Sequence, residues 1–224
     1  MEKHVVISDK LRAAAPDYQM IYLEADVVTS PSPTELINEL NALEAKYKAE
    51  YQVPDINKRP GIAATRKAYK ALGKDPNRYR PSQEQLMRRI VRGLGLYFID
   101  NLVDTGNLLS LTFGSSIGVF DRDKIEGDTI TVGVGEAGEP YEGIGRGPLN
   151  IEGLPVQRDA KGGIGTPTSD NERTKVTADT RRISMCVNIY GMESLPLSDM
   201  EALLTDRLTR YCSATNIEST LIGR

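Results

Sequence analysis

RPSQEQLMRRIVRGLGLYFIDNLVDTGNLLSLTFGSSIGVFDRDKIEGD, residues 80–128, is the most informative stretch of this chain. Within it, the otherwise apolar segment 98–111 carries the short polar side chains of Asp100, Asn101, Asp104, Asn107 and Ser110. A buried polar group costs roughly 1–3 kcal/mol unless it is hydrogen-bonded. The polar side chains therefore form either a fixed internal network or the wall of a polar pocket.

Local signals divide this stretch into elements. Ser82 and Gln85 form a capping box, which predicts a helix that ends at Gly93. A second helix is expected at about 101–112, and the β-branched residues of TITVGV (129–134) are typical of a strand.

Outward from this stretch, hydrophobic periodicity predicts the remaining elements. Strands are expected at 4–8, 19–28, 156–160, 181–191 and 217–222, and helices at 9–15, from 32, at 62–72 and from 198. Ser32 and Glu35 form the capping box of the second of these helices. Helices gather in the first half and strands are irregularly spaced, which indicates an α+β fold and not a regular strand–helix alternation.

Composition limits the classes of partner. The 224 residues carry a net charge of −3, with 39% hydrophobic and 26% charged residues, so one ordinary globular domain is expected. The acidic balance argues against strong non-specific nucleic-acid binding, and no DNA partner is expected. Local basic clusters remain at Arg88, Arg89 and Arg92, and at Arg181 and Arg182.

Residues suited to metal binding or histidine-based catalysis are few. Cys186 and Cys212 are the only cysteines, and His4 is the only histidine. Neither a zinc site nor histidine acid–base chemistry has a credible set of residues, and we expect no metal and no cofactor. Without a signal peptide or an apolar run of membrane-spanning length, a cytoplasmic protein and no membrane partner are expected.

Two glycine-rich stretches resemble nucleotide-binding motifs. Residues 133–138 match GxGxxG, but Glu139 and Pro140 follow, so no helix can begin there and a loop is predicted. Residues 162–166 lack the lysine of a P-loop. They form either a tight turn or a place where exposed backbone amides hold a carboxylate or phosphate.

The order of the motifs in this chain resembles a known family. The motifs are Pro81-Ser82, a helix ending in Gly93, Asn101-Leu102-Val103-Asp104-x-x-Asn107, and Phe120-Asp121-x-Asp123-Lys124-Ile125-x-Gly127. They are similar to the editing domain of the beta chain of bacterial phenylalanyl-tRNA synthetase, and 71–93 resembles free-standing versions of that domain. The resemblance implies a layered sandwich of mixed β-sheets with helices. It makes 1–224 a single domain, with integrated N-terminal elements at 1–79, an editing-domain-like core at 80–190 and a closing helix and strand at 191–224.

The resemblance also implies a function, and this sequence departs from the family's pattern at two positions. The family's domain hydrolyses tyrosine wrongly attached to phenylalanine tRNA. The family's histidine falls on Gly118, and the carboxylate that reads the tyrosine hydroxyl falls on Cys186. Tyrosine selectivity is therefore not expected, and the chain is too short to be a complete tRNA ligase.

Two functions follow from the resemblance. The chain is either an autonomous editing-like hydrolase of an aminoacyl-tRNA 3′ end or related aminoacyl compound, or a non-catalytic module that binds RNA or an amino acid. In the first case a positioned water attacks, and amides near 162–165 stabilise the oxyanion. No catalytic base is identified, and the oligomeric state is open. The candidate substrate-binding residues are Asn101, Asp104, Asn107, Asp121, Gly162, Gly163, Gly165, Arg173, Thr174 and Cys186, and the candidate RNA-binding residues are Arg88, Arg89, Arg92 and Arg181.

Overall fold

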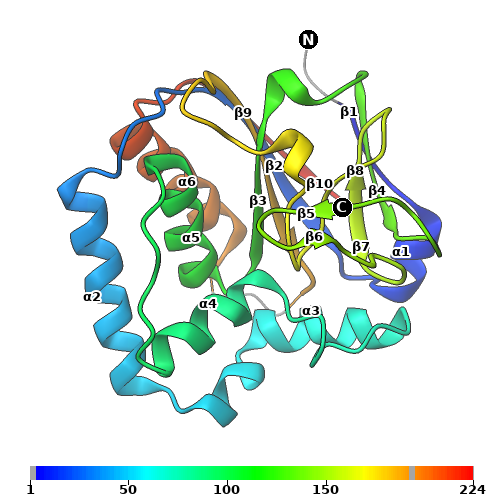
Figure 1. Ribbon diagram of the computed structural model, residues 1–224, viewed down its shortest axis with the longest axis horizontal. Coiled ribbons are helices and arrows are strands. Elements are labelled where there is room, and N and C mark those ends of the chain that lie inside the picture. Colours follow the sequence, from blue (N-terminus) through cyan, green and yellow to red (C-terminus); the bar gives the residue numbers. More distant parts are fainter. Residues whose placement is uncertain (1–3, 192–194, 224) are drawn as a thin grey trace.

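Two four-stranded sheets form the centre of the protein, and a layer of helices covers one face of the second sheet (Figure 1). The computed structural model describes residues 4–191 and 195–223. The strand order is β1-β4-β7-β8 in the first sheet and β10-β2-β9-β3 in the second. Strands β1 and β4 are parallel, and the other pairs in both sheets are antiparallel. The fold is therefore α+β with a mixed sheet, as the sequence predicts.

The elements have the following bounds. The helices are α1 (Asp9–Ala14), α2 (Thr34–Glu50), α3 (Pro60–Ala71), α4 (Ser82–Val91), α5 (Asn101–Phe113) and α6 (Leu197–Cys212), with 3₁₀ turns η1 (Val53–Lys58), η2 (Arg122–Lys124) and η3 (Glu172–Thr174). The strands are β1 (His4–Ile7), β2 (Gln19–Asp26), β3 (Ser116–Asp121), β4 (Thr129–Val134), β5 (Glu142–Gly143), β6 (Gly147–Pro148), β7 (Pro155–Arg158), β8 (Gly163–Gly165), β9 (Arg182–Ile189) and β10 (Thr215–Ile222).

Strand β2 contacts the layer on each side of its sheet, because its side chains alternate between the two faces. Ile21 and Leu23 point toward the helices, whereas Met20 and Tyr22 point toward the first sheet. Because side chains of a strand alternate between its faces, a strand buried on both sides needs apolar residues at nearly every position. This explains the uninterrupted apolar run 20–23, which is buried throughout.

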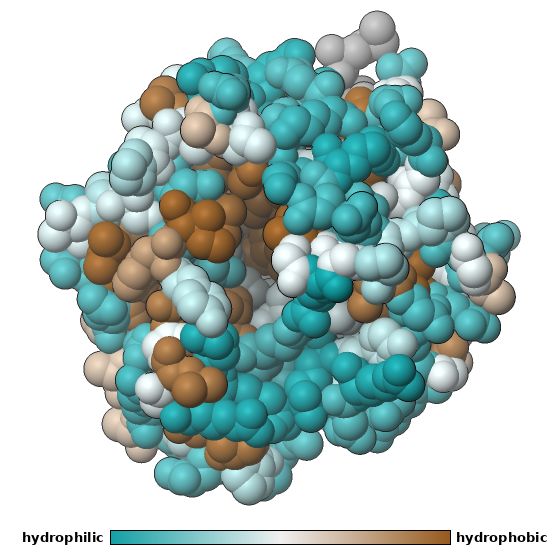
Figure 2. All heavy atoms as spheres, in the orientation of Figure 1, coloured by the Kyte–Doolittle hydropathy of each residue, from teal (hydrophilic) through white to brown (hydrophobic). Residues whose placement is uncertain are grey.

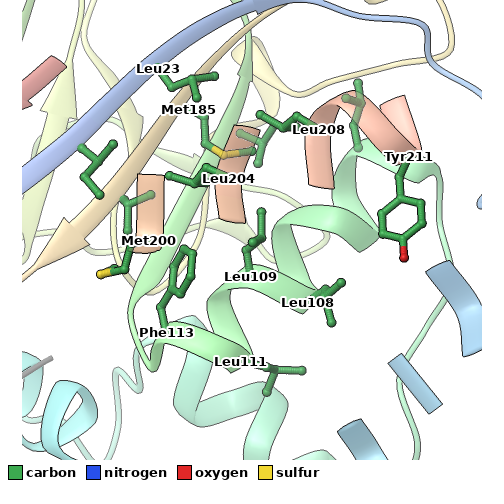
Figure 3. Close-up of a cluster of buried hydrophobic side chains, with 14 of the residues drawn as sticks. Leu23, Leu108, Leu109, Leu111, Phe113, Met185, Met200, Leu204, Leu208 and Tyr211 are labelled. Atoms are coloured by element: carbon green, nitrogen blue, oxygen red, sulfur yellow. The ribbon is translucent and has the colours of Figure 1, made fainter. Parts of the chain in front are cut away.

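The helical layer is held by one large apolar cluster. Leu109 and Phe113 of α5 pack against Met200 and Leu204 of α6 and against Met185 of β9 (Figure 3). All five side chains are at most 2% exposed. Helix α5 is therefore fixed between the second sheet and its neighbouring helices, with the polar side of its sequence directed elsewhere.

Phe120 of β3 fills the space between the two sheets. A β-carbon at Gly118 or at Gly165 would lie 2.5 Å from Cζ of the Phe120 ring. Glycine is therefore required at both positions by the close approach of the ring, and neither position is open to a ligand.

Two helix starts differ from the predicted capping boxes. Helix α2 begins at Thr34 after Pro33, and α4 begins at Ser82 after Pro81, in both cases without a side-chain cap. The Ser32 hydroxyl donates instead to Asp104, 2.5 Å away, because folding brings α5 beside this turn. Ser32 therefore bonds to a residue distant in the sequence and does not cap helix α2.

Residues 133–138 agree with the loop prediction in that no helix begins there: β4 ends at Val134, and the next element is the strand β5. No helix among the described residues is long and apolar enough to span a membrane.

Candidate functional site

A pocket opens at the free edge of β3, between α5 and the loop 170–176. We call it the edge pocket, and its cavity is about 380 Å³. Figure 2 shows a hollow with apolar walls near the centre of this face, where Figure 1 places α5 beside β3. Its apolar lining is Ile99, Val103, Ile117, Val119, Ile144 and Val176, and its polar lining is Asp100, Asn107, Asp170 and Lys175.

Helix α5 forms one wall of the edge pocket, and both of its ends are capped. The Asp100 carboxylate accepts a hydrogen bond from the Val103 amide at 2.8 Å, and Gly114 ends the helix with φ of 73°. Gly106 lets the helix lie close to β3, because a β-carbon there would be 3.0 Å from Cγ2 of Val119. Asn107, one residue further, lines the pocket.

Asp170 is the acidic group of the edge pocket. Its Oδ2 accepts a hydrogen bond from the Val119 amide at 3.3 Å, so the carboxylate lies against the edge of β3. Burial raises the pKa of Asp170 to about 7, and the Val119 hydrogen bond only partly opposes this. Such a carboxyl group changes its charge near neutral pH.

A second hollow continues from the edge pocket toward α4. We call it the basic groove; its cavity is about 330 Å³, and its lining includes Gln85, Arg89, Tyr97 and Arg146. The Arg89 guanidinium lies 4.0 Å from the Tyr97 ring centroid, and Arg146 donates to Gln85. Because Tyr97 is 68% exposed, one ring face remains open to solvent beside two cationic groups.

The pocket and the groove lie next to each other. They share the lining residues Ile99, Val103, Asn107 and Ile144. Three of these are apolar, and Ile99 and Ile144 are 65% and 40% exposed. Exposed apolar residues gathered around a depression are typical of a binding site.

Of the predicted substrate-binding residues, Asn107 alone lies in the edge pocket. Asn101 is 1% exposed and donates to the Val28 and Tyr211 carbonyls at 2.8 and 2.9 Å. Asp104 is enclosed and accepts from the Ser32 hydroxyl. These two residues join α5 to neighbouring segments, and neither lines the pocket.

Asp121, Arg173 and Thr174 form structural contacts outside the pocket. Asp121 accepts from the Thr180 hydroxyl at 2.8 Å and lies 3.1 Å from the Lys124 ammonium. Arg173 forms a two-bonded ion pair with Asp159, at 2.8 and 2.9 Å. Thr174 is fully buried and donates to the Ile164 carbonyl.

The glycine cluster does not present its amides to the edge pocket. The Gly162 amide donates to Asp159 at 3.0 Å, and Gly163 and Gly165 belong to β8. A β-carbon at Gly163 would be 2.8 Å from the Tyr141 ring, so an aromatic side chain covers that position. The glycine cluster 162–165 was expected to bind an oxyanion through its amides, but the structure places no pocket beside it.

Cys186 is enclosed between the two sheets. It is 0% exposed and pairs in register with Gly118 on β3. Burial, and then the charge of Asp170, raise the pKa of the Cys186 thiol. Cys186 and Gly118 therefore lie near the edge pocket, but Cys186 is not part of its lining.

Among the predicted RNA-binding residues, Arg89 alone lines the basic groove. Arg88 is paired with the buried Glu84 at 2.8 Å. Arg92 is exposed after the end of α4, and Arg181 lies before β9 and donates to nearby carbonyls, Ala178 and Thr180. The structure does not gather these four arginines on one surface.

Sequence reasoning missed Asp170, Lys175, Tyr97 and Arg146. Asp170 stands in the polar stretch TSDNERT, which is typical of an ordinary turn. Only pairing of the 170–176 loop with β3, including the bridge between Phe120 and Lys175, brings it to the pocket. The sequence carries one signal for this place, the apolar run 94–99 after the end of α4. Leu94, Tyr97, Phe98 and Ile99 of this run are exposed in the structure, which is typical of a binding surface.

No cluster of three or more histidine, cysteine or acidic residues suited to a metal ion occurs in the described part of the chain.

Comparison with known proteins identifies the family. The B3/4 domain model matches residues 64–210, so the chain belongs to the B3/4 domain family. The curated proteins gave no match.

A solved structure has a similar fold: an N-terminal fragment of the phenylalanyl-tRNA synthetase beta-subunit from Pyrococcus horikoshii. The identity is 15% and the TM-score 0.50, with 99% of this chain and 55% of that chain covered. This chain therefore spans about half the length of that fragment. The resemblance to a phenylalanyl-tRNA synthetase beta-chain domain predicted from the motifs is confirmed.

Proposed function

We propose that this chain binds the aminoacylated 3′ end of a tRNA, or a related aminoacyl compound. The acyl group occupies the edge pocket and the terminal nucleotide lies in the basic groove. The observation that carries the proposal is that the two hollows adjoin and share the lining residues Ile99, Val103, Asn107 and Ile144. One molecule can therefore contact both an apolar, acidic chamber and a basic, aromatic one.

The groove has the groups that single-stranded RNA ends require. The open face of Tyr97 suits a nucleobase, because bases stack on aromatic rings in most single-strand sites. Arg89 and Arg146 can each donate charge-assisted hydrogen bonds to phosphate. An RNA end is also in keeping with the fold that this chain shares with a fragment of a phenylalanyl-tRNA synthetase beta-subunit.

Binding, and not hydrolysis, is the function that the geometry supports. The amides of 162–165 that would stabilise an oxyanion are engaged or covered elsewhere. His4 is the only histidine and belongs to β1, outside the edge pocket and the basic groove. The chain is therefore proposed as a binding module derived from a synthetase editing domain.

Equilibrium binding of a non-hydrolysable 3′-aminoacylamido analogue of the CCA end tests the proposal. We expect Arg146→Ala to weaken binding about tenfold, the loss typical of one charge-assisted hydrogen bond. Arg181→Ala is the matched control, because this exposed arginine lies outside the groove, and it should bind as the wild type does. Equal binding by both variants would show that the basic groove does not bind the CCA end.

A deacylation panel separates binding from editing. Correctly and wrongly charged tRNAs are incubated with the purified protein, and we expect ester loss at the spontaneous rate. Loss well above that rate would replace the binding module by a hydrolase.

Tyrosine-selective hydrolysis of wrongly charged phenylalanine tRNA is specifically not expected. Cys186 stands where the resemblance places the carboxylate that reads the tyrosine hydroxyl, and a site without that acceptor loses the discrimination. Robust tyrosine-selective hydrolysis would show that the alignment at Cys186 is wrong.

A further inference from the structure

Asp170 is a carboxylate without a counter-ion at the wall of an apolar chamber. Its one side-chain hydrogen bond within the described residues is the 3.3 Å contact with the Val119 amide. A β-carbon at Gly118 would lie 3.3 Å from Oδ1, so that side of the carboxylate meets a residue with no side chain. No ion pair involving Asp170 occurs in residues 4–191 or 195–223.

The titratable groups around Asp170 do not neutralise it. Cys186 of β9 and Tyr141 before β5 are neutral groups, and the pKa of each is raised by burial and then by the charge of Asp170. Lys175 lies in the pocket wall, but its ammonium pairs with Glu172 at 2.5 Å. Asp100, from the segment before α5, adds a second acid to the lining.

An unpaired carboxylate in apolar surroundings is costly, and a bound cation removes most of that cost. A hydroxyl group donates one hydrogen bond and leaves the charge in place. A primary ammonium donates up to three hydrogen bonds and also neutralises the charge. The apolar residues around Asp170 fit the carbon stem that carries such a group.

We propose that Asp170 determines the specificity of the edge pocket by binding a protonated primary amine carried on a short apolar stem. The inference rests on the proposed function and defines the part of the ligand that the pocket selects. The amine meets the Asp170 carboxylate, and the stem lies against Val103, Ile117 and Val176.

The proposal predicts a particular pH dependence. The amine binds to ionised Asp170, whose pKa burial raises to about 7. Apparent affinity is reduced by the fraction of protein in the competent state, so binding should weaken about a hundredfold from pH 8 to pH 5.

The experiment uses benzylamine and benzyl alcohol as probes of equal size and shape. We expect the wild-type protein at pH 8 to bind benzylamine at least tenfold more tightly than the alcohol. Asp170→Asn should lose this preference. Asp179→Asn, the same change at an exposed aspartate that lines neither the edge pocket nor the basic groove, should keep it.

Calorimetry or amide chemical shifts measure both affinities, and thermal unfolding confirms that each variant folds. Because the pH profile uses the wild-type protein, it tests the proposal even if Asp170→Asn does not fold. Equal affinity for amine and alcohol, or an amine affinity that is flat from pH 5 to pH 8, overturns the proposal.

Failure of this inference is distinguishable from failure of the proposed function. Binding of the aminoacylated CCA analogue without an amine preference overturns the role of Asp170 alone. A clear amine preference together with no binding of that analogue supports Asp170 and overturns the RNA-end function alone.

Discussion

At the scale of single residues, the ionisation of Asp170 affects both the stability of the protein and the charge of the edge pocket. An ionised carboxylate in the edge pocket is tolerated because it faces a hollow and accepts one amide hydrogen bond, from Val119. The folded protein therefore holds a proton on Asp170 at pH values where the unfolded chain has released it. A residue that binds a cation is expected to cost stability when its ligand is absent.

The pH dependence of this cost can be measured. Because the folded pKa is about 7 and the ordinary value is 3.8, stability falls as pH rises between them, by on the order of 4 kcal/mol at most. We expect Asp170→Asn to be more stable than the wild type at pH 8 and to show a smaller fall from pH 4 to pH 7. Urea unfolding at several pH values measures both. A variant less stable than the wild type at pH 8 would contradict this account.

Asp104 and Asn107 lie on the same helix, but we assign a structural role to Asp104 and a binding role to Asn107. Asp104 accepts hydrogen bonds from Ser32 and from the Ile99 amide, and burial raises its pKa, whereas Asn107 faces the edge pocket. Asp104→Ala strands both donors and should cost about 1–3 kcal/mol.

Asn107→Ala should leave the melting temperature nearly unchanged and weaken binding of the aminoacyl analogue. Thermal unfolding alongside analogue binding measures both variants. An unchanged melting temperature for Asp104→Ala, or unaltered binding by Asn107→Ala, would show that these roles are assigned wrongly.

At the scale of elements, α4 divides its arginines between two faces. Arg88 turns inward to Glu84, which is 0% exposed and also pairs with Arg66 at 2.9 Å. Arg89 turns toward the basic groove and lies over Tyr97. Adjacent residues on a helix point about 100° apart, so neighbouring arginines acquire different roles.

Charge reversal distinguishes the two faces. Arg89→Glu should weaken binding of the CCA end, reduce its salt dependence and leave the fold intact. Arg88→Glu places a second acid beside Glu84 and should destabilise the protein by on the order of 2 kcal/mol. Salt titration of binding and denaturant unfolding measure the two effects. The opposite pattern, with Arg88→Glu affecting only binding, would reverse the assignment of the faces.

At the scale of the whole molecule, the packing of two sheets around Phe120 positions the edge pocket. The ring occupies the space over Gly118 and Gly165, so β3 and β8 approach closely on this side. The free edge of β3 is then left for the 170–176 loop, which carries Asp170. Because the Phe120 ring fills the space between the sheets, the accessible cavity, the edge pocket, lies at the edge of the sheet.

Overpacking this contact tests its importance. Gly165→Ala places a methyl group 2.5 Å from Cζ of Phe120 and should destabilise the protein by about 1–3 kcal/mol. Phe120→Leu removes the ring, so the double variant should be less destabilised than the sum of the single variants. Denaturant unfolding of the three variants gives the coupling free energy, and strict additivity would contradict the predicted contact.

Much of the fold followed from local patterns in the sequence. The apolar spacing from 101 to 112 predicted α5, and the β-branched runs predicted β2, β4 and β9, because periodicity records which faces are buried. The capping signals were less reliable. Ser32 has the residue type of a cap, but its hydroxyl found a better acceptor in Asp104, 72 residues away in the sequence.

The candidate site was predicted only in part. Asn107 and Arg89 were found because they belong to helices whose periodicity is visible. Asp121, Arg173 and Thr174 have residue types suited to ligand binding, but each found a partner inside the protein. Residue type alone does not tell an internal network from a pocket wall.

The α+β class, the family and the helix that forms one wall of the pocket can be predicted from the sequence. These depend on periodicity and on motif order, which are local properties of the chain. Tertiary structure alone decided that Asp170, from a turn-like stretch, lies against β3 without a counter-ion, while Asp104 is hydrogen-bonded inside. The physical reason is that the environment of a carboxylate is set by segments distant in the sequence, which meet only when the two sheets and the helices pack.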